Sequence, residues 1–372
     1  MNARLAAILS GEARDPAAIL ARAGLAPLGW LHHVGLETYL LPYATGLRRR
    51  HRLPVPTIAI GNLVSGGTGK TPMAELVGRL LQDAGHRPAL LSRGHGGAGE
   101  SAGGVLVVSD GAGGPIADPA DVGDEPVLLA RALPGVPVVV GRDRRRSGDA
   151  AVARFDPDVV FLDDALQYWQ LEKALEIHLC DTRRPFDNGA LLPRGLLREP
   201  PSHLRRASVV VLTRFDRADA VRQAASLARV KALAPRALVL TAIHAPVGWA
   251  GSDDGLAAVD AWSGARVRAV AGIADGAGFV DTVRRLGAEP AESCLFPDHH
   301  AYVTDEIEAI AAGGVDCVAT TEKDWVKLAS RWPAGAPPLR ALRVAMQVDR
   351  PDLLAAKLEE AIAGFPSCAP DR

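Results

Sequence analysis

The stretch that most constrains the fold is PTIAIGNLVSGGTGKTP, residues 56–72. It begins as an apolar run typical of a buried strand, passes through a glycine-rich loop, and leads into apolar residues at helical spacing. Such a strand–loop–helix unit can bind phosphate, because backbone N–H groups and a helix N-terminus point at the anion. Lys70 would add a point charge, and Thr71 a hydroxyl for Mg²⁺. The strict motif has glycine where Val64 stands, so a purely structural tight turn is the alternative.

Short apolar runs alternate with helical patterns over residues 55–235. These runs are nearly continuous, as expected of parallel strands that are buried on both faces. Examples are PALLS, VPVVVG, DVVFLDD, LEIHLCD and ASVVVLT. The alternation predicts an α/β fold with a phosphate-loop NTPase-like domain, built on a doubly wound, mostly parallel sheet.

A second, smaller α/β domain is expected after this region. The apolar runs ALVLTAIHAP and PLRALRVAMQVD flank it, and we expect them to form a two-stranded linker. The predicted segments are an apolar and basic N-terminal segment (1–52), the phosphate-loop domain (53–238), the linker strands with the smaller domain (239–348), and a C-terminal helix and tail (349–372).

Composition and charge exclude several classes of protein. Hydrophobic residues make up 48% and charged residues 23% of the 372 residues, which is ordinary for a folded protein and argues against disorder. The formal net charge is −1, so no global basic field attracts nucleic acid. The four cysteines lie far apart, which argues against a thiolate zinc site and fits a reducing cytosol. No feature of the sequence indicates a protein partner.

Residues 25–52, LAPLGWLHHVGLETYLLPYATGLRRRHR, combine apolar and aromatic residues with a basic end. Tryptophan and tyrosine beside arginines suit the headgroup zone of a membrane. A helix packed on the domain, with a solvated basic end, explains the pattern equally well. The N-terminus does not have the pattern of a secretory signal, and no apolar stretch reaches the roughly 18 to 20 residues needed to span a bilayer.

Polar residues follow several expected strands, at the edge where open α/β sheets bind ligands. Asp163 and Asp164 come directly after the run VVFL, where a phosphate-loop enzyme needs an acid that holds Mg²⁺. Guanidinium groups can bind a transferring phosphoryl group, although each arginine taken alone is more typical of a solvated surface. The other candidates at strand ends are Ser92, Arg93, His95, Asp124, Glu125, Arg142, Arg144, Arg198 and Glu199.

The stretch FPDHHAYVTDEIEAI raises the question of a metal site at Asp298, His299 and His300. Adjacent histidines point to different sides and no H-x-x-x-H spacing follows, which argues against such a site. Thr304 with its following acids is typical of a helix N-terminus. A histidine just ahead of that helix could act in catalysis, orient a catalytic group, or be structural.

In this order, these motifs resemble the tetraacyldisaccharide 4′-kinases, a family also called lipid A 4′-kinases. The residues that carry the resemblance are PTIAIGNLVSGGTGKTP, LLSRGHGG, VGDEPVLLA, GRDR, FLDDALQ, DTRRPFDNGALLPRGLLREP, DHH and TTEKD, and they cover most of the chain. The resemblance implies a phosphate-loop domain and a smaller α/β domain joined by a two-stranded linker. It also implies that the loop without its first glycine is usual in the family.

The function implied by the resemblance is transfer of the γ-phosphoryl group of ATP to a sugar hydroxyl. The acceptor would be the 4′-hydroxyl of a tetraacylated, β-1,6-linked glucosamine disaccharide 1-phosphate, an intermediate of lipid A biosynthesis. Mg²⁺ would be required. The enzyme would be peripheral, at the cytoplasmic face of the inner membrane, with the apolar N-terminal segment helping to seat it there.

The resemblance also assigns roles to individual residues. Asp124 matches the general base and His299 its partner, while Asp163 and Glu199 match acids near the metal, beside Thr71. The other matching catalytic groups are Lys70, Asp164, Arg144 and Arg198. The matching ATP-binding residues are Val64, Ser65, Gly66, Gly67, Thr68, Gly69, Lys70, Thr71 and Gln167.

The sequence departs from the family pattern in three places. His95 stands where tyrosine is usual, Ala165 replaces the glycine of DDG, and Asp187 replaces a glycine in FGNG. His95 puts a stacking contact with substrate or nucleotide in doubt.

Two other functions fit parts of the sequence. A regulatory phosphate-loop nucleoside triphosphatase is one, because TRFD (residues 213–216) is a near miss for the guanine-reading motif [NT]-K-x-D, with Arg214 in the lysine position. A kinase of a small soluble substrate is the other, and the apolar N-terminal segment argues against it.

Overall fold

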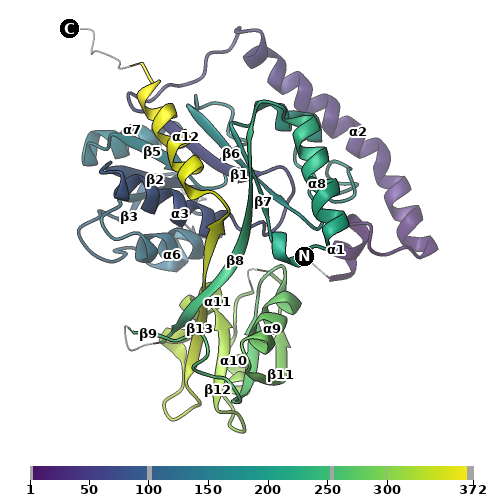
Figure 1. Ribbon diagram of the computed structural model, residues 1–372, viewed down its shortest axis with the longest axis vertical. Helices are drawn as coiled ribbons and strands as arrows, with labels where there is room; N and C mark the ends of the chain where they lie inside the picture. Colours follow the sequence, from purple (N-terminus) through teal and green to yellow (C-terminus); the bar gives the residue numbers. More distant parts are fainter. Residues whose placement is uncertain (1–2, 99–102, 252–254, 299, 367–372) are drawn as a thin grey trace. The chain divides into compact units, whose positions relative to one another are not determined.

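The computed structural model describes residues 3–98, 103–251, 255–298 and 300–366 (Figure 1). The chain divides into two compact units, a larger one of Arg4–Ile243 with Met346–Arg372, and a smaller one of His244–Ala345 with Met1–Ala3. Strands β8 (Leu238–Ala250) and β13 (Leu339–Val348) run through both units and are neighbours in the strand order. This pair corresponds to the predicted two-stranded linker.

The larger unit is built on a sheet with the strand order β8-β7-β6-β1-β5-β2-β4-β3. Neighbouring strands are parallel except at the edge, where β3 pairs antiparallel with β4. The strands besides β8 are β1 (Thr57–Asn62), β2 (Pro88–Ser92), β3 (Leu106–Ser109), β4 (Val138–Val140), β5 (Val159–Leu162), β6 (Leu175–Asp181) and β7 (Val209–Thr213). The helices are α1 (Ala3–Leu9), α2 (Pro16–Ala44), α3 (Lys70–Asp83), α5 (Pro119–Val122), α6 (Asp124–Ala132), α7 (Arg144–Phe155), α8 (Ala220–Leu233) and α12 (Pro351–Ala363), with the short 3₁₀ helices η1 (Pro201–Arg206) and η2 (Phe215–Arg217).

Strand β5 shows why the strands of this unit read as continuous apolar runs. A Cβ atom built on Gly78 of α3 would lie 3.1 Å from the ring of Phe161, so Phe161 faces α3. Its neighbour Val160 belongs to a core cluster with Ala151 of α7. Because successive strand residues point to opposite faces, α3 and α7 cover opposite faces of the sheet. The predicted α/β fold with a doubly wound, mostly parallel sheet is confirmed.

The smaller unit has its own parallel sheet in the order β11-β10-β12-β13. Its elements besides β13 are β9 (Leu256–Ala257), β10 (Arg266–Ala271), α9 (Gly276–Arg285), β11 (Glu289–Leu295), α10 (Thr304–Ile310), β12 (Cys317–Thr321), α11 (Glu322–Leu328) and η3 (Ala329–Arg331). Two core clusters fill it, one around Trp249 and Phe279 and the other around Tyr302 and Ile307. The smaller unit therefore has an apolar core of its own.

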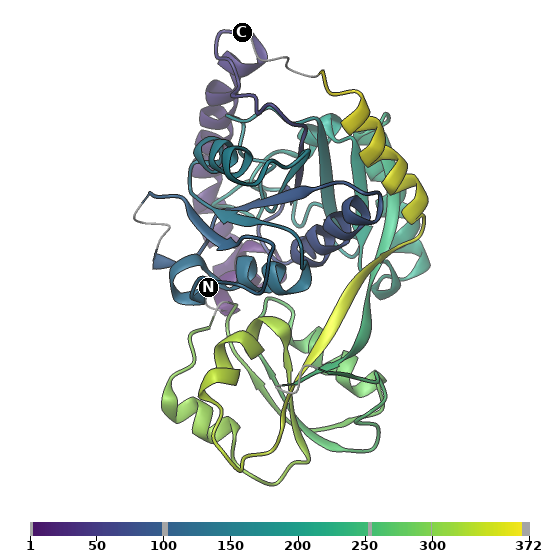
Figure 2. The ribbon, with the colours of Figure 1, turned by 90° about the vertical axis from the view of Figure 1, so that its left-hand side faces the viewer.

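Helix α2 is the long helix of the N-terminal segment and belongs to the larger unit (Figure 2). The Asp15 side chain caps its first turn by accepting a hydrogen bond from the N–H of Ala18. Several of its large apolar side chains are exposed, among them Leu20, Trp30, Leu31 and Leu41. In the described part of the chain, no helix is both long and apolar enough to cross a membrane.

Candidate functional site

The phosphate loop, residues 63–69, joins the carboxyl end of β1 to the first turn of α3. Asn62 holds it from within, because its side-chain amide donates to the carbonyl of Gly66 at 3.2 Å and to the hydroxyl of Thr68 at 2.9 Å. Gly66 and Gly69 have φ values of 129° and 93°, which side-chain-bearing residues rarely adopt. The loop thus has the conformation for which its glycines are needed.

Position 64 does not require glycine in this fold. Val64 forms an isolated antiparallel bridge with Leu197, and the N–H of Ser65 donates to the carbonyl of Leu196 at 2.7 Å. Val64 is not among the residues with positive φ, and its side chain packs partly buried against the core around Leu212. A valine suits an extended, half-buried position.

The segment that pairs with the loop is GALLPRGLLREP, residues 189–200, which we call the strap. The strap folds back on itself, with the N–H of Leu197 donating to the carbonyl of Ala190. A Cβ atom at Gly195 would lie 2.3 Å from that same carbonyl oxygen, so glycine is needed there. The strap carries Arg198 to the phosphate loop, where the N–H of Arg198 donates to the carbonyl of Leu63 at 2.7 Å.

Three charged side chains meet beside the phosphate loop. The Arg198 guanidinium donates to both carboxylate oxygens of Asp164, at 2.8 and 3.0 Å, and its Nε approaches the Ser65 hydroxyl at 3.4 Å. The Lys70 ammonium lies 3.7 Å from the same carboxylate. Two cations therefore share one anion, which leaves a net positive charge next to the loop. Such a cluster attracts the phosphates of a nucleotide.

Asp163 and Gln167 lie close to the base of the loop. Asp163 is buried at the end of β5, the strand that pairs with β1. The Gln167 side chain donates to the carbonyl of Asn62 at 3.1 Å, while its own oxygen and the side-chain oxygen of Asn62 are buried without a hydrogen-bond partner. Thr71 follows in the first turn of α3. The side-chain atoms that could bind a metal here are all oxygens.

This oxygen set fits Mg²⁺, which prefers oxygen ligands and usually needs only one or two carboxylates besides water and phosphate. Among the described residues, no group of three or more histidine, cysteine or acidic side chains is arranged to hold a metal by itself. Asp163 and Thr71 therefore suit a metal that arrives with the nucleotide.

Glu199 is fully buried, and its carboxylate binds other partners than Arg198 does. It accepts hydrogen bonds from His203 at 2.9 Å, from Arg206 at 2.5 Å and from the Trp169 indole at 3.3 Å. Burial raises the pKa of Glu199, but His203 and Arg206 outweigh it and lower the pKa to about 2. Glu199 is therefore ionised. A metal bound to Glu199 would have to share its carboxylate with these three hydrogen-bond donors.

Arg144 is buried at the start of α7, with 4% of its surface exposed. Its guanidinium donates to the carbonyl of Arg142 and lies over the Tyr168 ring, 5.4 Å from the ring centre. Burial, and then the nearby Arg93, lower its pKa, whereas Asp164 is among the groups that raise it. The structure thus brings Arg93 and Arg144 into the same charged region as Asp164.

Asp124 is the first residue of α6, and the loop before it packs against the loop of His95. A Cβ atom at Gly97 would lie 2.3 Å from the carbonyl oxygen of Asp121, and one at Gly123 would lie 2.5 Å from that of His95. Only glycine permits this backbone contact. Asp124 therefore directly follows a loop that adjoins the loop of His95, and His95 is exposed.

His299 lies outside the described residues, so its pairing with Asp124 stays a prediction. Its neighbour His300, in the smaller unit, donates a hydrogen bond to the Glu306 carboxylate at 2.9 Å and stacks on Phe296 with ring centres 4.5 Å apart. His300 also makes an edge contact with Tyr302. These contacts fit a structural role for His300.

The structure accounts for two departures from the family pattern. Ala165 is buried and is not among the residues with positive φ, so a side chain is tolerated there. Asp187 has a φ of 48°, which explains why glycine is usual at its position, and its carboxylate pairs with Arg184 at 2.9 Å. Nothing in the structure explains why histidine replaces the usual tyrosine at position 95.

Sequence reasoning missed two features of the site. Asn62, which holds the phosphate loop, is the polar residue at the end of β1, and this position could have identified it as a candidate. The partly buried network of Trp169, Lys173, Glu176, His203 and Arg206 around Glu199 was also missed, because Trp169 and Glu176 reach it from segments 23 to 30 residues away in the sequence.

The comparisons with known proteins agree on one family. A family model described as tetraacyldisaccharide-1-P 4′-kinase matches residues 21–363. Relatives named tetraacyldisaccharide 4′-kinase include one from Syntrophus aciditrophicus (strain SB), 42% identical over 298 residues, 77% of this chain and 79% of that protein. Another, from Anaeromyxobacter dehalogenans (strain 2CP-C), is 43% identical over 323 residues, 85% of this chain and 84% of that protein.

A solved structure is also similar to this chain. It is the crystal structure of the "apo" form of LpxK from Aquifex aeolicus in complex with ATP, with a TM-score of 0.75, 28% sequence identity, and coverage of 92% of this chain and 99% of that one. The resemblance read from the motifs is confirmed. The chain belongs to the tetraacyldisaccharide-1-phosphate 4′-kinase family.

Proposed function

We propose that this chain transfers the γ-phosphoryl group of ATP to the 4′-hydroxyl of a tetraacylated glucosamine disaccharide 1-phosphate. Its family membership makes it a kinase with a hydroxyl acceptor, acting in lipid A biosynthesis. The observation that carries the proposal is the phosphate loop with Lys70 and Arg198 gathered around Asp164. Binding of ATP is supported by the similar LpxK structure, which contains ATP.

The two alternative functions are not favoured. In the guanine-reading alternative, Arg214 would have to serve the nucleotide base, but its guanidinium is paired with Asp181 at 2.7 Å. A small soluble acceptor is disfavoured because the curated relatives named above are all disaccharide kinases.

The chain's own side chains would bind and orient the phosphates. Lys70 and Arg198 would exchange part of their attraction to Asp164 for the β- and γ-phosphate oxygens, and Arg144 would supply a further fixed positive charge. Thr71 and Asp163 would hold Mg²⁺, with Glu199 as the third candidate ligand nearby. When bound, Mg²⁺ would neutralise charge on the phosphate oxygens.

Asp124 is proposed as the base that accepts the proton of the sugar hydroxyl, with His299 as its partner. A carboxylate alone is a weak base near neutral pH, and a histidine held against it could orient it and share the proton. Asp124 lies in the larger unit and residue 299 in the sequence of the smaller one. Pairing would therefore couple domain closure to activation of the hydroxyl.

We further propose that the protein is peripheral at the cytoplasmic face of the inner membrane, and that α2 seats it there. Trp30 and Leu31 of α2 are 74% and 69% exposed, which is unusual for such large apolar side chains. The basic run Arg48, Arg49 and Arg50 follows the helix and is exposed. Exposed apolar groups beside arginines are typical of a segment that lies in a membrane interface.

The phosphate loop can be tested with Lys70→Ala. The substitution removes a charge that faces the transferring group, so we expect the phosphoryl-transfer rate to fall by on the order of 10³-fold. The variant should still fold, because Asp164 keeps its two bonds from Arg198. Arg79→Ala, on the same helix but paired with Glu75, is the matched control and should retain activity. A folded Lys70→Ala enzyme with nearly normal kcat would refute the assignment.

The base and its partner can be tested with Asp124→Ala, His299→Ala and the double variant. Each single change should lower kcat strongly, with a modest effect on the KM for ATP, because neither residue is proposed to bind the nucleotide. The double variant should be little slower than the slower single one, since residues that act as a unit have non-additive effects. Asp121→Ala, in the neighbouring helix α5, is the control. Fully multiplicative losses would contradict the pair.

Membrane seating can be tested with Trp30→Ser combined with Leu31→Ser. Exposed apolar side chains that enter a membrane contribute roughly 1.5–3 kcal/mol each, so binding to anionic vesicles should weaken at least tenfold. Val221→Ser with Ile116→Ser removes two other exposed apolar side chains of the larger unit and should have little effect. Added salt should release part of the wild-type protein, because the arginines act through screened attraction. Equal losses in both double variants would contradict a specific role of α2.

A further inference from the structure

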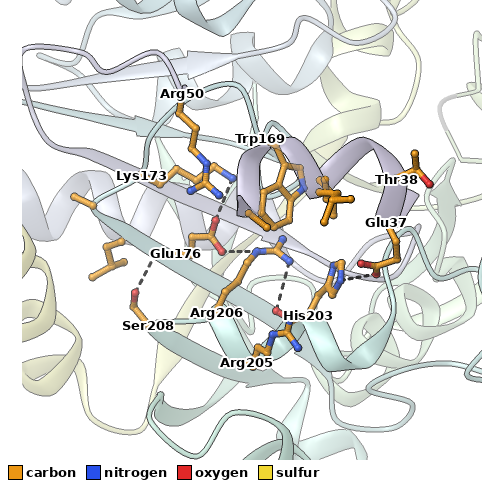
Figure 3. A pocket seen from close by; sticks show the side chains of 15 residues that line it. Glu37, Thr38, Arg50, Trp169, Lys173, Glu176, His203, Arg205, Arg206 and Ser208 are labelled. Atoms are coloured by element: carbon orange, nitrogen blue, oxygen red, sulfur yellow. Dashed lines mark hydrogen bonds and ion pairs between the residues drawn. The ribbon is translucent and has the colours of Figure 1, made fainter. Parts of the chain in front are cut away.

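A cavity of about 560 Å³ lies between α2 and the body of the larger unit (Figure 3). We call it the α2 pocket. Its wall includes Thr38 and Leu41 of α2, Trp169, and Arg205 at the end of η1. None of the phosphate-loop residues lines it. All of its lining residues belong to the larger unit.

The α2 pocket and the phosphate loop lie at opposite ends of the parallel strands. Leu175, which lines the pocket, is the first residue of β6, and Ser208 directly precedes β7. The phosphate loop instead follows the last residue of β1, which is parallel to β6. The pocket is therefore at the amino ends of parallel strands, away from the reacting phosphates.

Cations surround one indole ring in this pocket. The ring of Trp169 has the Arg206 guanidinium 4.6 Å from its centre, the Arg50 guanidinium at 5.3 Å and the Lys173 ammonium at 5.9 Å. Two of these three cations are neutralised, because Lys173 pairs with Glu176 at 3.1 Å and Arg206 pairs with Glu199 at 2.5 Å. The third, Arg50, has no carboxylate partner among the described residues.

The remaining charges of the pocket do not compensate for Arg50. Arg205 lines the pocket as well, and no carboxylate of the described chain pairs with it. The pocket's other acid, Glu37, is already paired with His203 at 3.0 Å. Two exposed guanidinium groups thus face a cavity whose carboxylates are all engaged, and this arrangement favours an anion.

The pocket also has an apolar side. Leu41 of α2 lines it and is 59% exposed, and Ala44 extends the same wall. Leu47, beyond the end of the helix, is also exposed. A ligand with an anionic head and hydrocarbon chains satisfies both sides at once, whereas a nucleotide or a free anion would leave the apolar side in water.

We propose that the α2 pocket binds the phosphodiester headgroup of an anionic phospholipid, through Arg50 and Arg205, with the acyl chains along Leu41. The inference rests on the proposed membrane seating of α2 and adds a headgroup site that is separate from the phosphoryl acceptor. Basic pockets beside membrane-facing helices suit such headgroups, because guanidinium groups form paired hydrogen bonds with phosphate oxygens.

The proposal can be tested by comparing two double variants that lose the same charge. Arg50→Gln with Arg205→Gln removes the pocket arginines, while Arg49→Gln with Arg236→Gln removes two exposed arginines of the same unit that do not line the pocket. Binding is measured by flotation with phosphatidylcholine vesicles that do or do not contain phosphatidylglycerol. We expect the pocket variant to lose about tenfold or more in affinity for the phosphatidylglycerol vesicles, and the control only a few-fold. Equal losses would show diffuse attraction and overturn the proposal.

A soluble probe separates this proposal from the membrane seating. Short-chain dihexanoyl phosphatidylglycerol, used as monomers, should bind the wild-type protein saturably and change its tryptophan fluorescence, and Trp169→Phe should reduce that change. If the wild-type protein ignores vesicles but binds this probe, the membrane seating fails and the pocket stands. If it binds vesicles but not the probe, the pocket fails alone.

Two further outcomes identify a wrong ligand. Inorganic phosphate that displaces the short-chain lipid at equal concentration would show a simple anion site and overturn the proposal. A pocket variant with a raised KM for the disaccharide substrate, and unchanged binding to vesicles, would place the substrate there instead. We do not expect displacement by phosphate, because a free anion would leave the apolar side of the pocket in water. We do not expect a raised KM, because the pocket lies at the amino ends of the strands.

Discussion

The contact on which the site depends is the carboxylate of Asp164 held between Arg198 and Lys70. Asp164 follows β5 with a φ of 49°, so the chain turns sharply where the strand ends and aims the carboxylate at the loop. Arg198 reaches it because the strap pairs with residues 63–65. One carboxylate thereby holds two cations in place before any nucleotide arrives. In the proposed function, this preorganisation means that the phosphates would meet charges whose positions are already fixed.

The strap also connects the phosphate loop to α2. A Cβ atom on Gly29 of α2 would lie 3.5 Å from the carbonyl of Leu191, and His32 lies 3.5 Å from the carbonyl of Arg198. Further along, Glu37 pairs with His203, which binds Glu199 of the strap. The helix proposed to contact lipid therefore touches the segment that forms one wall of the nucleotide site. An enzyme with a soluble nucleotide and a lipid acceptor needs both surfaces close together.

The sequence alone predicted what depends on local pattern. The apolar runs, the glycine loop and the acids after β5 were recognisable, because strand periodicity and strand ends are written in consecutive residues. The pairing of Val64 with Leu197 was not, since it joins segments about 130 residues apart. The family resemblance indicated that the first glycine is dispensable, and the extended conformation of Val64 gives the physical reason. Glu199 shows the same limit, because Trp169, its neighbour in space, lies 30 residues away in the sequence. The pairing of Asp124 with His299 remains a prediction.

The central claim is that the charges around the phosphate loop direct the γ-phosphoryl group of ATP to one hydroxyl of a lipid. The most direct measurement incubates the purified protein with Mg²⁺, ATP labelled with ¹⁸O in the γ-phosphoryl group, and the tetraacylated disaccharide 1-phosphate in detergent. The label is then located in the product by ³¹P NMR. The account predicts a new phosphomonoester at the 4′-position, formed in step with ATP consumption, and little hydrolysis of ATP without the lipid. Hydrolysis of ATP at the same rate with or without the lipid, and no label at the 4′-position, would contradict it.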